Sequence, residues 1–115
     1  MVPMFILHRE GIELDGSAPL LQYGMCCVKE RLFRHDMTVI GSGGNDVSLL
    51  PSFSPTWISF VTLYGGIVAF PNIRGGSEFG TGWADAGKKR HIMNGVSDFV
   101  SATCAQFPNT KCIKF

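Results

Sequence analysis

Residues 66–80 of this chain read GIVAFPNIRGGSEFG and join a short apolar run to a glycine-rich loop. The apolar run, residues 66–72, has the length and the β-branched content of a buried strand. Glycines recur after it, so residues 75–87 are predicted to form a loop. A buried strand that runs into such a loop, with helical patterns before and after it, is typical of an α/β sheet whose strands are joined by crossovers.

Two further strands are predicted upstream of this run. They cover residues 3–8 and 18–23, and the turn signal Asp15-Gly16 lies between them. An opening hairpin is therefore expected. Residues 11–14 alternate in polarity and are expected to pair or to extend the first strand.

Two helices and a last strand complete the predicted order. Apolar residues recur at helical spacing over residues 56–63, which predicts the first helix. A second helix, capped by Asn94 or Ser97, is expected to end by Pro108. Residues 110–115 alternate in polarity and predict the start of a strand.

Length and composition limit the chain to one small domain and exclude several classes of protein. It has 115 residues, 45% of them hydrophobic, so disorder is not expected. The net charge of +1 provides no basic field for nucleic acid. No apolar run approaches the roughly 20 residues that span a membrane, and residues 1–9 lack the order of a signal peptide.

The cysteines predict a reducing compartment. Cys26, Cys27, Cys104 and Cys112 form no zinc-like CxxC pairs, and the adjacent Cys26 and Cys27 are poorly placed to bridge each other. Four reduced thiols and a cytoplasmic location are therefore predicted. No metal or cofactor is predicted.

No catalytic nucleophile is assigned. A Gly-x-Ser-x-Gly turn is absent from the sequence, and Ser42 and Ser77 are interpreted as turn or loop serines. His8, His35 and His91 are interpreted as solvated surface residues rather than catalytic bases. Neither a dinucleotide-binding nor a P-loop motif is present.

Several stretches resemble, in order, the start of the catalytic domain of one enzyme family. They are residues 2–6 (VPMFI), 11–17 (GIELDGS), 20–24 (LLQYG) and 72–80 (NIRGGSEFG), then Trp83, then Asn94, Asp98 and Phe99. The family that they resemble is the prolyl oligopeptidase family of serine peptidases. The resemblance covers most of the chain outside residues 25–41, and the combination is more specific than any single piece.

The resemblance implies both a fold and an activity. The implied fold class is α/β, a partial α/β-hydrolase sheet with opening strands, helix, strand, helix and strand, ending before the nucleophile turn. Residues 1–115 would form part of the peptidase catalytic domain. The family are hydrolases that cleave short peptides after proline with a Ser-Asp-His triad under a β-propeller lid. The parent protein is thus expected to bind proline-containing peptides, with no nucleic acid or membrane partner, and this chain alone is expected to be inactive.

Seven residues match the glycine-rich motif of the family and are predicted to have structural roles. They are Asn72, Arg74, Gly75, Gly76, Glu78, Gly80 and Trp83. Ser77 replaces a glycine of that motif. Arg74 and Glu78 are expected to hold the loop by ion pairing and backbone hydrogen bonds; the alternative is a solvated pair worth under about 1 kcal/mol.

A second family loop, Tyr-Gly-Tyr-Gly-Gly-Phe, supplies a tyrosine hydroxyl to the oxyanion hole and a phenylalanine to the substrate pocket. Its two ends match Tyr23, Gly24, Gly43 and Gly44, which are predicted to frame the loop near the expected oxyanion region. The tyrosine position falls on Met25 or Ser42, and the phenylalanine position on Asn45. None of these side chains can replace the family residue, so no catalytic residue is assigned.

Residues 25–41 separate the two ends of that loop and differ from their surroundings in charge. Codons for Gly24-Met25-Cys26 can contain GTATGT, a common start of fungal introns. One hypothesis is that the segment is a retained intron or another gene-model error. The alternative is a genuine surface insertion, which loops tolerate.

Two other functions also fit the sequence. The first is a non-catalytic short isoform or remnant that associates through an exposed strand edge, near residues 66–72 or 110–115. The second is another α/β-hydrolase, such as an acyl-peptide hydrolase or an esterase. The motif at residues 72–80, with Trp83, favours the peptidase family over the second.

Overall fold

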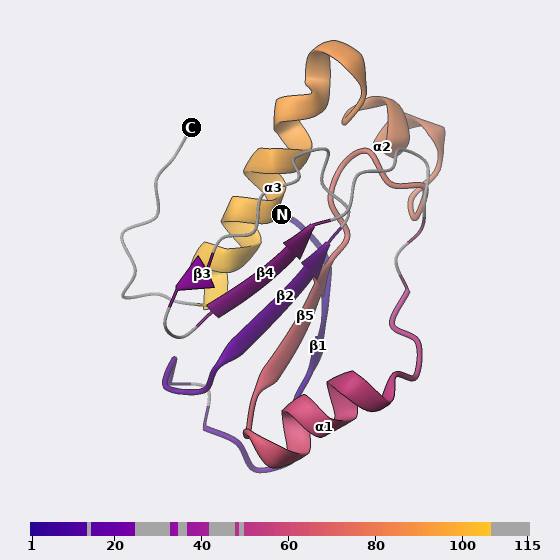
Figure 1. The fold of residues 1–115 in the computed structure, drawn as a ribbon. Helices are drawn as coiled ribbons and strands as arrows, with labels where there is room; N and C mark the ends of the chain where they lie inside the picture. The colour runs from indigo at the N-terminus through magenta and orange to yellow at the C-terminus, as the bar shows by residue number, and fades with distance from the viewer. Residues whose placement is uncertain (14, 25–32, 35–36, 42–47, 49, 107–115) are drawn as a thin grey trace.

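The computed structural model describes residues 1–13, 15–24, 33–34, 37–41, 48 and 50–106 (Figure 1). The strands are β1 (Met4–Leu7), β2 (Leu20–Gly24), β3 (Phe33–Arg34), β4 (Met37–Gly41) and β5 (Ile67–Pro71). The helices are α1 (Pro55–Leu63), α2 (Thr81–Asp85), the 3₁₀ turn η1 (Lys89–His91) and α3 (Ile92–Gln106).

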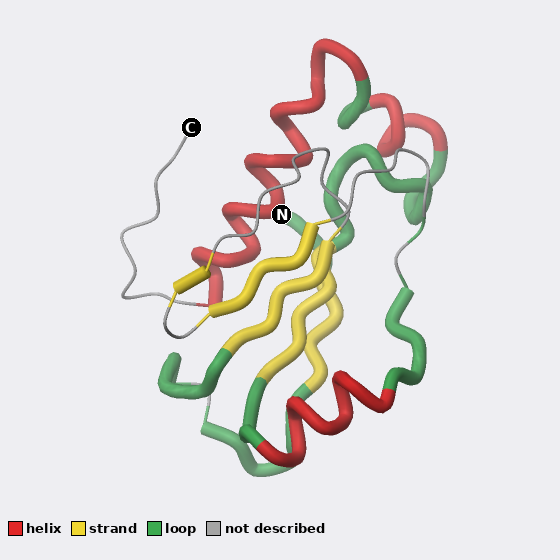
Figure 2. Tube along the Cα trace, in the orientation of Figure 1, coloured by secondary structure: helices red, strands yellow, loops and turns green. Residues whose placement is uncertain are grey.

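The strands form one mixed sheet in the order β1-β5-β2-β4-β3 (Figure 2). β2 is parallel to both of its neighbours, β5 and β4, while the outer strands β1 and β3 are antiparallel to theirs. The predicted α/β class is confirmed at this level. In the described chain, α1 lies between the parallel strands β4 and β5, which is the pattern that a crossover connection produces.

The predicted opening hairpin was wrong. β1 pairs with β5, with Phe5 opposite Phe70, and β5 separates β1 from β2. The predicted turn at Asp15-Gly16 is present, since Gly16 has a φ of +85° and Asp15 accepts hydrogen bonds from Ser17. It reverses a loop between non-adjacent strands. Residues 11–13 also form no strand.

Alternate residues of the central strands face different helices. Leu20 and Ala69 pack against Phe99 of α3, while Leu21 and Val68 pack with Val61 of α1. Successive side chains of a strand point to opposite faces, so two apolar residues in a row supply both layers of the core. α1 and α3 therefore cover opposite faces of the sheet (Figure 1).

The local predictions downstream were largely confirmed. The predicted first helix is α1, which begins with Pro55 in its first turn, a position where proline lacks no needed hydrogen bond. The predicted strand over residues 66–72 is β5. α3 begins at Ile92, ahead of both predicted caps, and Asn94 lies inside it with its side-chain amide bonded to the Ala86 carbonyl.

Two further predictions need correction. The loop predicted over residues 75–87 contains the short helix α2, which starts after Gly80, where φ is +84°. The free edge predicted at residues 66–72 does not exist, because β5 is paired on both sides. Among the described strands β1 provides the open edge on that side of the sheet.

The segment 25–41 contains β3 and β4. All five residues of β4 pair in parallel with β2, so this part of the segment occupies a place inside the sheet. The strand predicted over residues 110–115 lies outside the described residues, as do Gly43 and Gly44. No described helix is long and apolar enough to cross a membrane.

Candidate functional site

The glycine-rich motif follows β5 directly, at the carboxyl end of the parallel strands. Asn72 is buried, and its backbone N–H donates to the Pro3 carbonyl at 2.9 Å, which ties the start of the loop to the chain before β1. In open α/β sheets, ligands bind outside the carboxyl ends of the strands. This loop is therefore the part of the described chain on which a candidate site is built.

An ion pair with α3 holds the loop in place. The Arg74 guanidinium donates from Nε to Asp98 Oδ2 at 2.8 Å and from Nη2 to Asp98 Oδ1 at 2.7 Å. The backbone N–H of Arg74 donates to the same carboxylate at 3.0 Å. The Asp98 side chain is only 7% exposed, and its hydrogen bonds raise the pKa of Arg74. A bidentate ion pair of this kind fixes the orientation of the guanidinium as well as its distance from the carboxylate.

The partner of Arg74 differs from the expected one. The sequence pointed to Glu78, four residues away, whereas the described contacts of Arg74 run to Asp98, 24 residues away. Glu78 instead folds over Gly76, where its Oε2 occupies the space that a Cβ would need. The position of Asp98 within the matching helix was visible in the sequence, but its role was missed.

Two glycines lie next to Arg74: Gly75 follows it in the chain, and Gly87 packs against its carbonyl. Gly75 has a φ of +110°, which side chains rarely adopt. A Cβ on Gly87 would collide with the Arg74 carbonyl, so the chain after α2 touches the motif loop backbone to backbone. Only a residue without a side chain permits this contact.

Trp83 anchors α2 onto the same loop. Its indole Nε1 donates to the Ile73 carbonyl at 3.0 Å, and its own carbonyl accepts from the Gly75 N–H at 3.1 Å. The ring of Phe79 lies edge-to-face with the indole, with 5.2 Å between centroids. The motif residues thus form a compact backbone scaffold that presents no nucleophile of its own.

The expected loop-framing residues stand at the end of β2. The Tyr23 ring packs against Trp57 and Phe70, with centroids 5.7 and 6.1 Å apart. Gly24 leaves room for the ring of Phe99, which would collide with a Cβ there. Both residues lie at the carboxyl end of a strand adjacent to β5, so they share one end of the sheet with the motif loop.

Polar groups also connect β2 to α3. Gln22 is fully buried, and its amide donates to the Phe99 carbonyl at 3.0 Å. Its Oε1 accepts from the Thr103 hydroxyl at 3.0 Å. Since both ends of the amide are satisfied, this buried link sets the position of α3 on the sheet.

The candidate residues Ser77, His8 and His91 show no catalytic arrangement in the described part of the chain. Ser77 is exposed, and its carbonyl accepts from the Gly80 N–H in a turn. His8 and His91 are exposed, and Nδ1 of His8 lies 2.8 Å from the Arg9 carbonyl. Ser42 and His35 lie outside the described residues.

The thiol prediction needs one correction. Cys104 on α3 is disulfide-bonded, so four reduced thiols are not present. The other three cysteines lie outside the described residues. The cysteines therefore no longer argue for a cytoplasmic location.

Comparisons with known proteins agree with this geometry. Residues 51–109 match the prolyl oligopeptidase family. Prolyl oligopeptidase A of Amanita bisporigera is 40% identical over 102 residues, and prolyl endopeptidase of Elizabethkingia miricola is 36% identical over 104 residues. These alignments cover 89% and 88% of this chain, but 11% and 12% of the relatives.

Solved structures give the same result. Prolyl oligopeptidase B from Galerina marginata superposes with a TM-score of 0.75 at 33% identity, over 96% of this chain and 13% of that one. The same enzyme has been solved with a 35mer hydrolysis and macrocyclization substrate, and it superposes with a TM-score of 0.75 at 34% identity over 94% of this chain and 13% of that one. This chain therefore spans about an eighth of the length of its relatives, and it belongs to the prolyl oligopeptidase family.

Proposed function

We propose that this chain forms part of the catalytic domain of a serine endopeptidase that cleaves short peptides after proline. The observation that carries the proposal is the motif loop, residues 72–80, at the carboxyl end of the parallel strands. Its anchoring by Asp98 and Trp83 gives it a defined position next to the end of β2. In enzymes built on such sheets, loops at this end carry the reacting groups.

The described residues would act in this enzyme as a scaffold. Oxyanion donors and nucleophiles must be held to within a fraction of an ångström, and rigid neighbouring loops provide that precision. The Arg74–Asp98 pair and the buried Gln22 link supply rigidity without taking part in bond making. By itself, the 115-residue chain is proposed to be inactive.

A peptidase assay tests this proposal. The transcript is sequenced downstream of the codon for Phe115, and both the 115-residue chain and the full product are tested on a fluorogenic peptide with an internal proline. We expect turnover by the full product, loss of turnover when the serine of its Gly-x-Ser-x-Gly is changed to alanine, and none by the 115-residue chain. Turnover by the 115-residue chain, or a full product without Gly-x-Ser-x-Gly, would contradict the proposal.

We further propose that residues 25–41 interrupt the oxyanion loop as a retained intron or as an insertion. The charged composition of the segment supports this reading, while the pairing of β4 with β2 gives it a place in the folded chain. Sequencing the transcript across codons 24–42 separates the alternatives. Spliced messages that join codon 24 to codon 42 support the intron, and messages that all keep the segment support the insertion.

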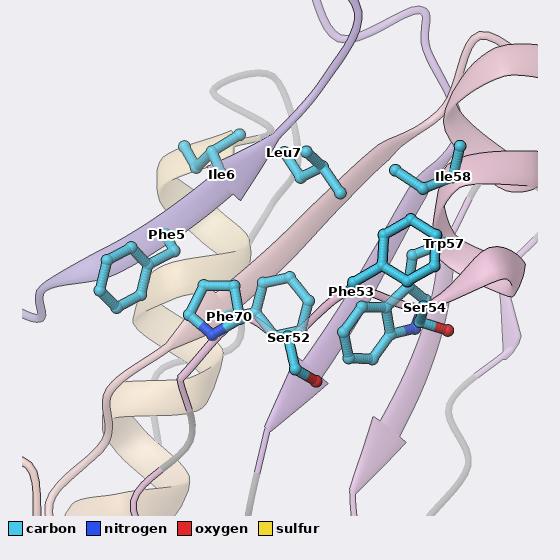
Figure 3. A pocket seen from close by; sticks show the side chains of 10 residues that line it. Phe5, Ile6, Leu7, Ser52, Phe53, Ser54, Trp57, Ile58 and Phe70 are labelled. Carbon is cyan, nitrogen blue, oxygen red and sulfur yellow. The ribbon is translucent and has the colours of Figure 1, made fainter.

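A second function is favoured by the open edge of β1. Phe5 and Ile6 are 45% and 46% exposed, although they lie on a strand that pairs with β5 on one side. They line an apolar pocket of about 290 Å³ together with Phe53, Trp57 and Ile58 (Figure 3). Exposed strand edges beside apolar surface pair with other strands, so a second copy of this chain is the proposed partner in a non-catalytic role.

Light scattering after size-exclusion chromatography tests self-association. The expected result is a dimer at micromolar concentration that Ile6→Lys converts to a monomer. Leu63→Lys provides the control, since Leu63 is also exposed but lies on α1 outside the pocket. A monomer before any substitution excludes this function.

The cytoplasmic location stays a prediction, which fractionation of the source cells can test.

A further inference from the structure

Four consecutive basic residues gather beside a surface hollow next to the motif loop. Residues 88–91, here called the basic turn, comprise Lys88, Lys89, Arg90 and His91. Together with Asp85 they line a hollow of about 560 Å³. Three of the ten lysines and arginines of the chain lie in this turn. The turn is therefore much more positive than the net charge of +1 would indicate.

In the described part of the chain, few acidic side chains lie around the hollow. Among the described residues, Asp85 is the one acidic side chain that lines it, and its Oδ1 lies 3.7 Å from Lys88 Nζ. The side chain of Asp85 is three-quarters exposed, so this pair is weak. Lys89, Arg90 and His91 are exposed. Lys89 and Arg90 are neighbours in the chain, so their like charges repel, and an anion in the hollow would relieve this repulsion.

One residue of the basic turn has a strained backbone conformation. Lys89 has a φ of +50°, and it is the one residue other than glycine with a positive φ in the described chain. Residues other than glycine that adopt this left-handed backbone conformation occur at ligand clamps, where the surrounding structure holds them. Here the His91 N–H donates to the Lys88 carbonyl at 2.9 Å and the Lys88 N–H to the Asp85 carbonyl at 3.2 Å.

The position of the turn agrees with a ligand-binding role. Gly87 precedes the turn and touches the Arg74 carbonyl, so the basic turn is joined to the loop at the carboxyl end of β5. Figure 1 places α2 and the start of α3 beyond the ends of the parallel strands. α3, 15 residues long, starts at Ile92, so the positive end of its dipole adds to the charge of the turn.

We propose that the hollow at the basic turn binds the carboxylates of an acidic peptide segment. Arginine can grip a carboxylate with two parallel hydrogen bonds, and lysine adds a point charge with three donors. The choice of a peptide rests on the proposed peptidase function, in which the segment would extend a substrate beyond the bond to be cleaved. Binding itself needs no catalysis, so the two proposals fail separately.

Fluorescence anisotropy of a labelled peptide tests the site directly. The probe is a hexapeptide with three glutamates, compared with the same hexapeptide carrying glutamines. With the full chain we expect saturable binding of the acidic probe only, weakened as salt is raised. Lys89→Gln with Arg90→Gln is expected to weaken binding roughly tenfold.

Matched variants separate a local site from general charge. Arg9→Gln removes an exposed positive charge elsewhere, and the expected change in Kd is less than about twofold. Lys89→Gly removes one charge and the strain together, so it should weaken binding while raising thermal stability. Equal binding of the glutamine probe, an equal effect of Arg9→Gln, or complete displacement by equimolar inorganic phosphate would overturn the proposal.

Discussion

Apolar packing occurs on both faces of the sheet, and the α3 face adds directional polar contacts. On the α3 face, directional polar contacts cross the interface, namely the Gln22 amide with Phe99 and Thr103 and the Arg74 guanidinium with Asp98. On the α1 face, the contacts are the apolar packing of Val61 and Val68 and the aromatic rings of Tyr23, Trp57 and Phe70. Apolar packing depends on area and shape, whereas each hydrogen bond demands one partner in one place.

The candidate site lies on the face that has the directional contacts. The motif loop belongs to the α3 face, where the contacts allow little sliding of the helix. The α1 face ends in an open apolar pocket between β1 and α1, which tolerates more rearrangement (Figure 3). The loop proposed to support the catalytic site is thus anchored on the face with directional contacts.

Removing one ring from the aromatic cluster on the α1 face should reduce stability the most. Phe70 is buried against Trp57, with ring centroids 4.7 Å apart. Phe70→Ala should lower the free energy of unfolding by about 3–5 kcal/mol, because it leaves a cavity in a packed core. Chemical denaturation measures the loss. Phe53→Ala is the control, since that ring is 83% exposed, and a similar loss there would contradict the comparison.

The second effect concerns the ion pair on the α3 face. Asp98→Asn removes the charge that Arg74 needs and leaves one acceptor in place of two. We expect a loss of about 2–3 kcal/mol, below the value for a fully buried pair because the Arg74 side chain is 34% exposed. The matched variant Asp85→Asn breaks an exposed pair and should cost under about 0.5 kcal/mol. Equal losses would show that burial does not distinguish the two pairs.

The close backbone contact of the motif loop predicts a third, smaller effect. Gly87→Ala places a Cβ against the Arg74 carbonyl, which must shift, at a cost of about 1–3 kcal/mol. Gly82→Ala in α2 meets nothing within 4 Å and should stabilise the chain by up to about 1 kcal/mol. Thermal melts of both variants give opposite signs if the packing is as described.

The smallest effect lies in the exposed turn that precedes β2. Hydrogen bonds from the Ser17 hydroxyl and N–H lower the pKa of Asp15. The stabilisation is therefore present above the ordinary pKa of about 3.9, and it is lost as the pH falls through the lowered value. An NMR titration should show the pKa of Asp15 rising toward its ordinary value in Ser17→Ala. An unchanged pKa in that variant would remove the role of the hydroxyl.

Local patterns predicted five of the described elements, but not β3, β4, α2 or η1. The alternation or apolar content of short runs identified β1, β2 and β5, and helical spacing identified α1 and α3, because these signals lie within ten to fifteen residues of chain. The short helix α2 was missed, since its glycine and threonine give no helical pattern. Its anchor, the hydrogen bond of Trp83 to Ile73, is a tertiary contact.

The family and the residues of the motif loop can be read from the sequence, because their identity and spacing are carried along the chain. The pairing of β1 with β5, and of Arg74 with Asp98 rather than Glu78, follows from the packing of the folded chain. The reason is physical: strand edges and carboxylates are chemically alike wherever they occur. The choice among them depends on which one the packed helices and sheet bring within hydrogen-bond distance.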